Sequence, residues 1–85
     1  MKLKHDLTEK AKQIEPILRI GKSGLTRGAI DEIKVQLKRN KLIKIKLLKS
    51  ALEGKDKKEL GKEIAAKTGS ELIHQVGFVV VLHKK

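Results

Sequence analysis

An uninterrupted apolar run near the C-terminus, residues 78–82 (Phe-Val-Val-Val-Leu), constrains the fold more than any other feature of this sequence. β-Branched and aromatic residues favour strands, and a strand with one wet face alternates between apolar and polar side chains. This run does not alternate, so both of its faces must be covered and the strand must lie in the middle of a sheet. We therefore expect helices on both faces of that sheet.

Three further strands are expected. Residues 71–76 form a strand that a single glycine separates from the apolar run, and so short a connection requires an antiparallel pair. Residues 42–47 alternate, with Lys44 and Lys46 on one face and apolar side chains on the other. The segment 16–20 is rich in branched residues and begins with a proline, which is tolerated at the first position of a strand.

Two helices are expected in the first half of the chain. Apolar residues at helical spacing between positions 3 and 14 predict a first helix, which Pro16 ends. Thr26 is a suitable N-cap for a second helix over residues 27–39, with Asn40 as its stop.

A third helix is expected over residues 57–68. Asp56 and Glu59 resemble a capping box at its start, and Gly69 suits its C-terminal end. Residues 50–55 before it have no clear period and are expected to form a connecting loop.

The predicted order is α-β-α-β-α-β-β, which defines an α/β fold with a mixed four-stranded sheet. The two β-α-β units require parallel near neighbours with right-handed crossovers. The first helix is the element left over to cover the second face of the central strand. At 85 residues the chain suits one domain over residues 1–85.

A glycine-bracketed loop, Gly21-Lys22-Ser23-Gly24, lies between the first strand and the second helix. Glycines let the backbone turn sharply and approach a partner closely. The helix start beyond them offers free N–H groups and a partial positive charge, so the loop favours an anion. The upstream glycine of a P-loop is missing, which disfavours hydrolysis of nucleoside triphosphates.

The charge balance identifies the class of anion. The chain carries 21 Lys and Arg against 10 Asp and Glu, a formal net charge of +11, whereas solubility alone requires about 2 to 8 net charges in a small domain. Such an excess favours a polyanion, above all the phosphate backbone of a nucleic acid. On the second helix, three- and four-residue spacing aligns one acidic and four basic residues beside the loop: Arg27, Asp31, Lys34, Lys38 and Lys41.

Membranes and secretion are disfavoured. No apolar run approaches the roughly 18 to 20 residues of a membrane span, and no helix combines a basic face with a bulky aromatic one. The polar N-terminal segment does not resemble a secretory signal. We expect a cytoplasmic protein.

Phe78 is the single aromatic residue of the chain. Modules that read single strands by stacking need several exposed rings, so electrostatic and shape-based contact with structured RNA or a duplex fits better. The absence of a visible helix-turn-helix disfavours DNA.

Catalytic and metal chemistry find no support in the residue pattern. The three histidines, His5, His74 and His83, lie far apart without partners at ligand spacing. No nucleophile, base and oxyanion set is visible, so we expect no enzyme, cofactor, metal or small-molecule substrate. His74 is expected on the open sheet face near Lys44 and Lys46, where it could contact a phosphate.

Taken together, the loop of residues 20–26, the helix start at 28–33, the strand at 42–46 and Thr68-Gly69 resemble the CRM domain, named for chloroplast RNA splicing and ribosome maturation. The resemblance spans essentially the whole chain. It implies a small stand-alone prokaryotic RNA-binding protein associated with precursors of the large ribosomal subunit. It also implies a fold similar to the C-terminal domain of translation initiation factor three.

In that family the Gly-x-x-G loop is likened to the backbone clamp of KH domains, although a KH loop joins two helices and this one joins a strand to a helix. We expect a monomer that binds structured ribosomal RNA, and the alternative is a basic adaptor that docks on an acidic protein. The expected RNA-binding residues are Gly21, Lys22, Ser23, Gly24, Thr26, Arg27, Lys34, Lys38 and Lys41, with Arg19, Lys44 and Lys46 as further candidates.

Overall fold

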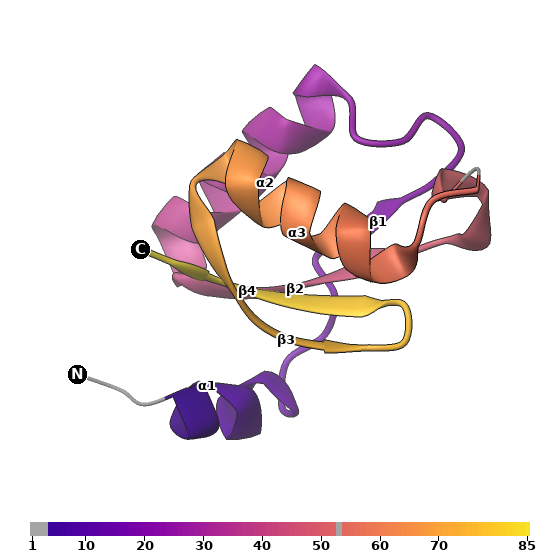
Figure 1. The fold of residues 1–85 in the computed structure, drawn as a ribbon. Helices are drawn as coiled ribbons and strands as arrows, with labels where there is room; N and C mark the ends of the chain where they lie inside the picture. Colours follow the sequence, from indigo (N-terminus) through magenta and orange to yellow (C-terminus); the bar gives the residue numbers. More distant parts are fainter. Residues whose placement is uncertain (1–3, 53) are drawn as a thin grey trace.

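The fold has the predicted class and order of elements. The computed structural model describes residues 4–52 and 54–85 and contains three helices and a mixed four-stranded sheet (Figure 1). In chain order the elements are α1 (Lys4–Ala11), β1 (Leu18–Ile20), α2 (Arg27–Asn40), β2 (Leu42–Leu47), the 3-10 turn η1 (Lys49–Ala51), α3 (Lys57–Thr68), β3 (Ser70–Val76) and β4 (Val79–Lys84).

The apolar β4 lies inside the sheet, as its composition predicts. The strand order is β1-β2-β4-β3. β1 pairs with β2 in parallel, and β4 is antiparallel to both β2 and β3. β3 therefore runs in the same direction as β2, which satisfies the expected β-α-β geometry without direct pairing of the two strands.

Helices cover both faces of the sheet, but unequally. α2 and α3 pack on one face, and α1 lies alone on the other (Figure 1). β4 contributes side chains to both layers. Val80 and Leu82 pack in the main core with α2 and α3, while Val81 packs in a smaller cluster under α1. This smaller cluster comprises Leu7, Ala11, Leu42, Ile73 and Val81.

A bulge in β3 decides which side chains face α1. Leu72 pairs with Leu82, whereas His74 already pairs with Val81, so Ile73 is the additional residue. Leu72 packs against the main core and Ile73 against the α1 cluster. Strict alternation would return His74 to the face of Leu72, but the bulge keeps it on the α1 side of the sheet.

Several predicted boundaries were wrong by a few residues. α1 ends at Ala11, well before Pro16, and a short turn continues to Ile14, whose N–H donates to the Ala11 carbonyl. β1 begins two residues after the proline, although the Ile17 N–H already donates to the Lys44 carbonyl of β2 at 2.9 Å. Leu3, which opened the predicted first helix, lies outside the described residues.

The second helix also ends later than predicted. α2 includes Asn40, and Lys41 adopts the positive φ of 62° that stops it. The first two residues of the expected connecting loop, 50 and 51, belong to the turn η1 instead of an irregular segment.

The capping residues act largely as their sequence positions predict. The Thr26 hydroxyl accepts a hydrogen bond from the Ala29 N–H at 3.1 Å, and the Asp56 carboxylate accepts one from Lys58 at 3.4 Å. Gly69 ends α3 in the left-handed conformation with φ of 65°. The reciprocal bond from Glu59 that would complete a capping box is absent from the described part of the chain.

A buried pair of hydroxyls joins the end of α3 to the start of β3. Thr68 Oγ1 donates to the Ile64 carbonyl at 2.7 Å and lies 2.7 Å from Ser70 Oγ. Both residues are almost completely shielded from solvent. Because Thr68 donates to the carbonyl, Ser70 donates to Thr68, and this bond gives the buried Ser70 hydroxyl its acceptor.

Replacing Thr68 by Val should therefore destabilise the protein by about 1 to 3 kcal/mol, because it leaves the buried Ser70 hydroxyl without a partner. Urea denaturation measures the free energy of unfolding. Thr68→Ser keeps the hydroxyl and should retain most of the stability. Adding Ser70→Ala to Thr68→Val should recover part of the loss, and a double variant less stable than Thr68→Val alone would contradict this account.

Candidate functional site

The glycine loop, residues 21–24, is a closed turn. The Gly24 N–H donates to the Gly21 carbonyl at 2.8 Å, and Lys22 and Ser23 occupy the two exposed corner positions. Gly24 has φ of 69°, which favours glycine. The Thr26 N–H then donates to the Gly24 carbonyl at 3.1 Å, which directs the chain into α2. The turn therefore presents a lysine and a hydroxyl to solvent at a helix start.

The loop lies where three chain segments meet. β1 and β2 are parallel, so both end here, and the β3–β4 turn reaches the same end because the Leu47 N–H donates to the Phe78 carbonyl at 2.6 Å (Figure 1). The Leu48 N–H donates to the Ile20 carbonyl at 2.8 Å just before the loop. The ends of parallel strands are common positions for ligand sites in α/β proteins.

Lys49 and Ser50, which were not among the predicted binding residues, lie in the segment that borders the loop. A Cβ at Gly21 would lie 3.8 Å from Ser50 Oγ and 3.4 Å from Leu48 Cδ1, so the segment after β2 packs beside the turn. Exposed Lys49 belongs to this segment. Their position in the sequence could have predicted this. The segments that follow two neighbouring parallel strands leave the sheet at the same end and therefore lie beside each other.

The start of α2 is electropositive. No acidic residue occupies its first turn, and the first N–H groups of a helix lack intrahelical acceptors. Arg27, Lys34 and Lys38 are exposed along the helix. A 14-residue helix is about 21 Å long, so these cations form a track that leads away from the loop. We call residues 21–24 with Arg27, Lys34, Lys38, Lys49 and Ser50 the loop surface.

Lys41 lies at the far end of that track. Its N–H donates to the Leu37 carbonyl at 2.9 Å, and its own carbonyl accepts from Lys84 at 2.7 Å. The backbone of Lys41 is thus held by the last strand, about one helix length from the glycine loop.

The other predicted binding residues lie on the opposite side of the sheet. Arg19 pairs in register with Lys46, and both point away from the core that α2 and α3 cover, as does Lys44. The structure therefore divides the predicted site into two surfaces. We call the second surface the open sheet face; it carries Arg19, Lys44, Lys46, His74, Val76 and Val79.

The acidic residues do not neutralise these cations. The ion pairs in the described part of the chain are Lys12 with Glu9 at 3.4 Å and Glu63 with Lys67 at 2.9 Å and Lys55 at 3.5 Å. The hydrogen bond from Lys67, with the nearby charge of Lys55, lowers the pKa of Glu63, so this carboxylate stays ionised to a lower pH than an ordinary glutamate. Within residues 4–52 and 54–85, no carboxylate forms an ion pair with a cation of the loop surface.

Neither a metal-binding cluster nor a membrane-spanning helix occurs in residues 4–52 and 54–85. Among the described residues, no three His, Asp or Glu side chains form a group that could hold a metal ion. The helices of that same part of the chain are too short and too polar to cross a membrane.

Residues 1–84 match the CRS1 / YhbY (CRM) domain. The chain is 37% identical over 83 residues to a probable RNA-binding protein of Methanocaldococcus jannaschii, covering 98% of this chain and 61% of the relative. It is 31% identical to the probable RNA-binding protein YqeI of Bacillus subtilis, covering 99% and 85%. The chain thus spans less than two thirds of the archaeal relative.

A solved structure shares the fold. The solution structure of a hypothetical protein from Staphylococcus aureus, proposed to bind RNA, superposes with a TM-score of 0.79 at 33% identity. The match covers 96% of this chain and 83% of that one.

Replacing each of the two loop glycines by alanine should change the free energy of unfolding by different amounts. Gly24→Ala forces an L-residue into positive φ and should lower the free energy of unfolding by about 1 to 2 kcal/mol, although its Cβ meets no atom within 4 Å. Gly21→Ala needs no such φ and fits against Leu48, so its stability should change by less than about 1 kcal/mol. Urea denaturation of both variants tests this, and equal losses would contradict it.

Proposed function

Because this chain belongs to the CRS1/YhbY (CRM) domain family, we propose that it binds RNA and does so through the loop surface. One observation carries the proposal: Lys22 is exposed on a glycine turn directly before the electropositive start of α2, and no carboxylate of the described residues pairs with it. The names of the relatives, which describe RNA-binding proteins, agree with this function.

The chemistry of binding follows from the turn. Gly21 and Gly24 let the RNA backbone approach closely, and Lys22 supplies charge. The Ser23 hydroxyl and the free N–H groups at the start of α2 donate hydrogen bonds to a phosphate oxygen. Thr26 caps the helix and so fixes the direction of these donors. Arg27, Lys34, Lys38 and Lys41 extend the contact along neighbouring phosphates.

Phosphate contact dominates over base stacking in this proposal. Phe78 is half-buried, and the Lys57 ammonium lies 5.1 Å from the centroid of its ring. The single ring is therefore engaged within the protein. A surface of lysines and backbone donors reads the shape of a folded RNA rather than its sequence.

The family resemblance also suggests which RNA is bound. We propose structured ribosomal RNA in precursors of the large subunit, with the protein acting as a non-enzymatic, cytoplasmic monomer in ribosome assembly. Ribosomal RNA suits a surface of this kind because its folded regions bring many phosphates together at fixed positions.

Binding should depend steeply on salt. With about five phosphate contacts, the slope of log affinity against log salt concentration should lie between roughly −3 and −5. Lys22→Ala should weaken binding of different RNA sequences alike and make the slope shallower by about 1. The matched control is Lys62→Ala, an exposed α3 residue outside both surfaces. Fluorescence anisotropy over a salt series measures both quantities, and a slope near zero would exclude the electrostatic mechanism.

The ribosomal ligand requires a test in cells. The native protein should co-sediment with large-subunit precursors on a gradient, ribonuclease should abolish this, and crosslinks should map to residues 21–24. A complex that survives ribonuclease would instead indicate a basic adaptor bound to an acidic protein, and migration as a free small protein would exclude the ribosomal proposal.

A further inference from the structure

The helix α1 covers only part of its face of the sheet. It has eight residues, which corresponds to about 12 Å, and its cluster reaches Leu42, Ile73 and Val81. Beyond this cluster the sheet continues toward the β3–β4 turn. There Val76 is 62% exposed, the highest value among the large exposed hydrophobic side chains of the described residues.

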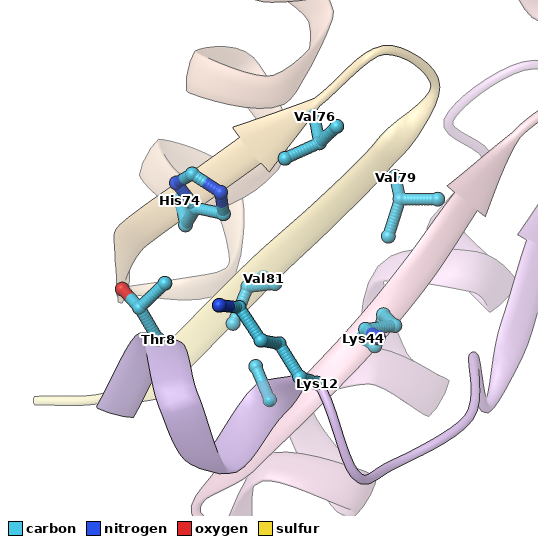
Figure 2. Close-up of a pocket in the computed structure, with 8 residues that line it drawn as sticks. Thr8, Lys12, Lys44, His74, Val76, Val79 and Val81 are labelled. Atoms are coloured by element: carbon cyan, nitrogen blue, oxygen red, sulfur yellow. The ribbon is translucent and has the colours of Figure 1, made fainter. Parts of the chain in front are cut away.

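A pocket of about 230 Å³ lies between α1 and this uncovered part of the sheet. Its floor is apolar, formed by the valines of β3 and β4 and by the buried Ala11. Three basic side chains surround the floor: Lys12, which follows α1 and pairs with Glu9, Lys44 of β2 and His74 of β3 (Figure 2). Pockets for drug-sized ligands measure about 300 to 1,000 Å³, so this one suits a single flat group that belongs to a larger molecule.

The sheet register places basic side chains beside valines. In one row Val81 lies between Lys44 and His74. In the next row Lys46 pairs with Val79, and Val79 with Val76. Neighbouring strands are about 4.8 Å apart. The valines of the floor therefore lie only one strand away from the ammonium-bearing lysines of β2. A ligand that fits has an apolar group over the valines, an anion on the Lys44 side and a hydrogen-bonding group on the His74 side.

Arg19 and Lys46 connect the pocket to the glycine loop. Arg19 lies two residues before Gly21 and pairs in register with Lys46, which pairs with Val79 of the pocket. A continuous row thus leads from the loop end of the sheet to the pocket. Lys44 is half-buried at the rim, and no carboxylate within residues 4–52 and 54–85 forms an ion pair with it.

We propose that this pocket takes one unpaired nucleobase of an RNA strand whose flanking phosphates contact Lys44 and His74. The inference rests on the proposed RNA-binding function and adds a second, base-contacting surface to it. Valine methyl groups contact the faces of the base, and the lysine stems lie along its edge. The contact makes no use of aromatic rings and therefore agrees with the aromatic-poor composition of the chain.

Charge favours RNA over a protein occupant. A nucleotide strand carries phosphate oxygens on each side of every base, which matches a floor bordered by the Lys44 ammonium on one side and by His74, a hydrogen-bond donor, on the other. A protein segment would need carboxylates on both sides of an apolar residue, and it would gain nothing from the row of Arg19 and Lys46 that leads to the loop surface. The same row lets one RNA strand pass from the loop to the pocket.

Two RNA hairpins test the proposal: one with a fully paired stem and one with a single unpaired uridine in the same stem. Wild-type protein should bind the second about fivefold more tightly. Val79→Phe fills the pocket and should remove this preference, while Val35→Phe adds the same ring to an exposed position on α2 and should keep it. Thermal denaturation of both variants checks that they fold.

Crosslinking gives a second readout that does not depend on variants. With 4-thiouridine at the unpaired position, crosslinked peptides should contain residues 8–12 or 74–81. Lys22→Ala should weaken both hairpins equally and leave their ratio unchanged, whereas Lys44→Ala should weaken mainly the hairpin with the unpaired base.

The outcomes separate this inference from the function on which it rests. Equal binding of both hairpins by wild-type protein, or an unchanged preference in Val79→Phe, would overturn the pocket assignment while Lys22→Ala still supports RNA binding by the loop. Failure to bind either hairpin or any other RNA would overturn both.

Discussion

The antiparallel pairing of β2 with β4 is the contact on which the remaining structure depends. It places Ile45 opposite Val80 and Lys44 opposite Val81, so Ile45 and Val80 join the core under α2 and α3 while the lysines of β2 lie on the opposite face. Strand side chains alternate with a period of two, and a slip of one residue would bring Lys44 and Lys46 into the main core. Burying unpaired ammonium groups there would cost several kcal/mol each, and this penalty fixes the register.

That register also determines where the positive charge lies. Because the main core occupies one face of the sheet, the lysines of β2 must share the other face with the short α1. The parallel β1 delivers its glycine loop at the end of the sheet, beside the segment that follows β2. One pairing therefore produces two basic surfaces that meet at the same end of the molecule, and the rigid sheet keeps them at a fixed separation.

The elements with strong local signals could be predicted from the sequence. The non-alternating run of β4 led to its central position, and the capping residues Thr26 and Gly69 marked helix ends that the structure confirms. The bulge at Ile73 could not be foreseen, because it results from pairing with a strand across a turn and leaves no local pattern. The sequence analysis listed Arg19, Lys44 and Lys46 with the loop residues as one set of RNA-binding candidates, but in the structure these three lie on the open sheet face. This separation also results from strand pairing.

The two surfaces differ in what they can contribute to recognition. Contacts to phosphates supply affinity that is nearly independent of sequence, and contacts to a base supply discrimination. The loop surface offers only charge and backbone donors, so by itself it would bind many folded RNAs similarly. The proposed base pocket, joined to the loop by Arg19 and Lys46, would make the second contact intramolecular once the first has formed. A modest apolar contact would then be sufficient to select among RNAs, and a chain with a single, engaged aromatic ring would combine electrostatic binding with selectivity.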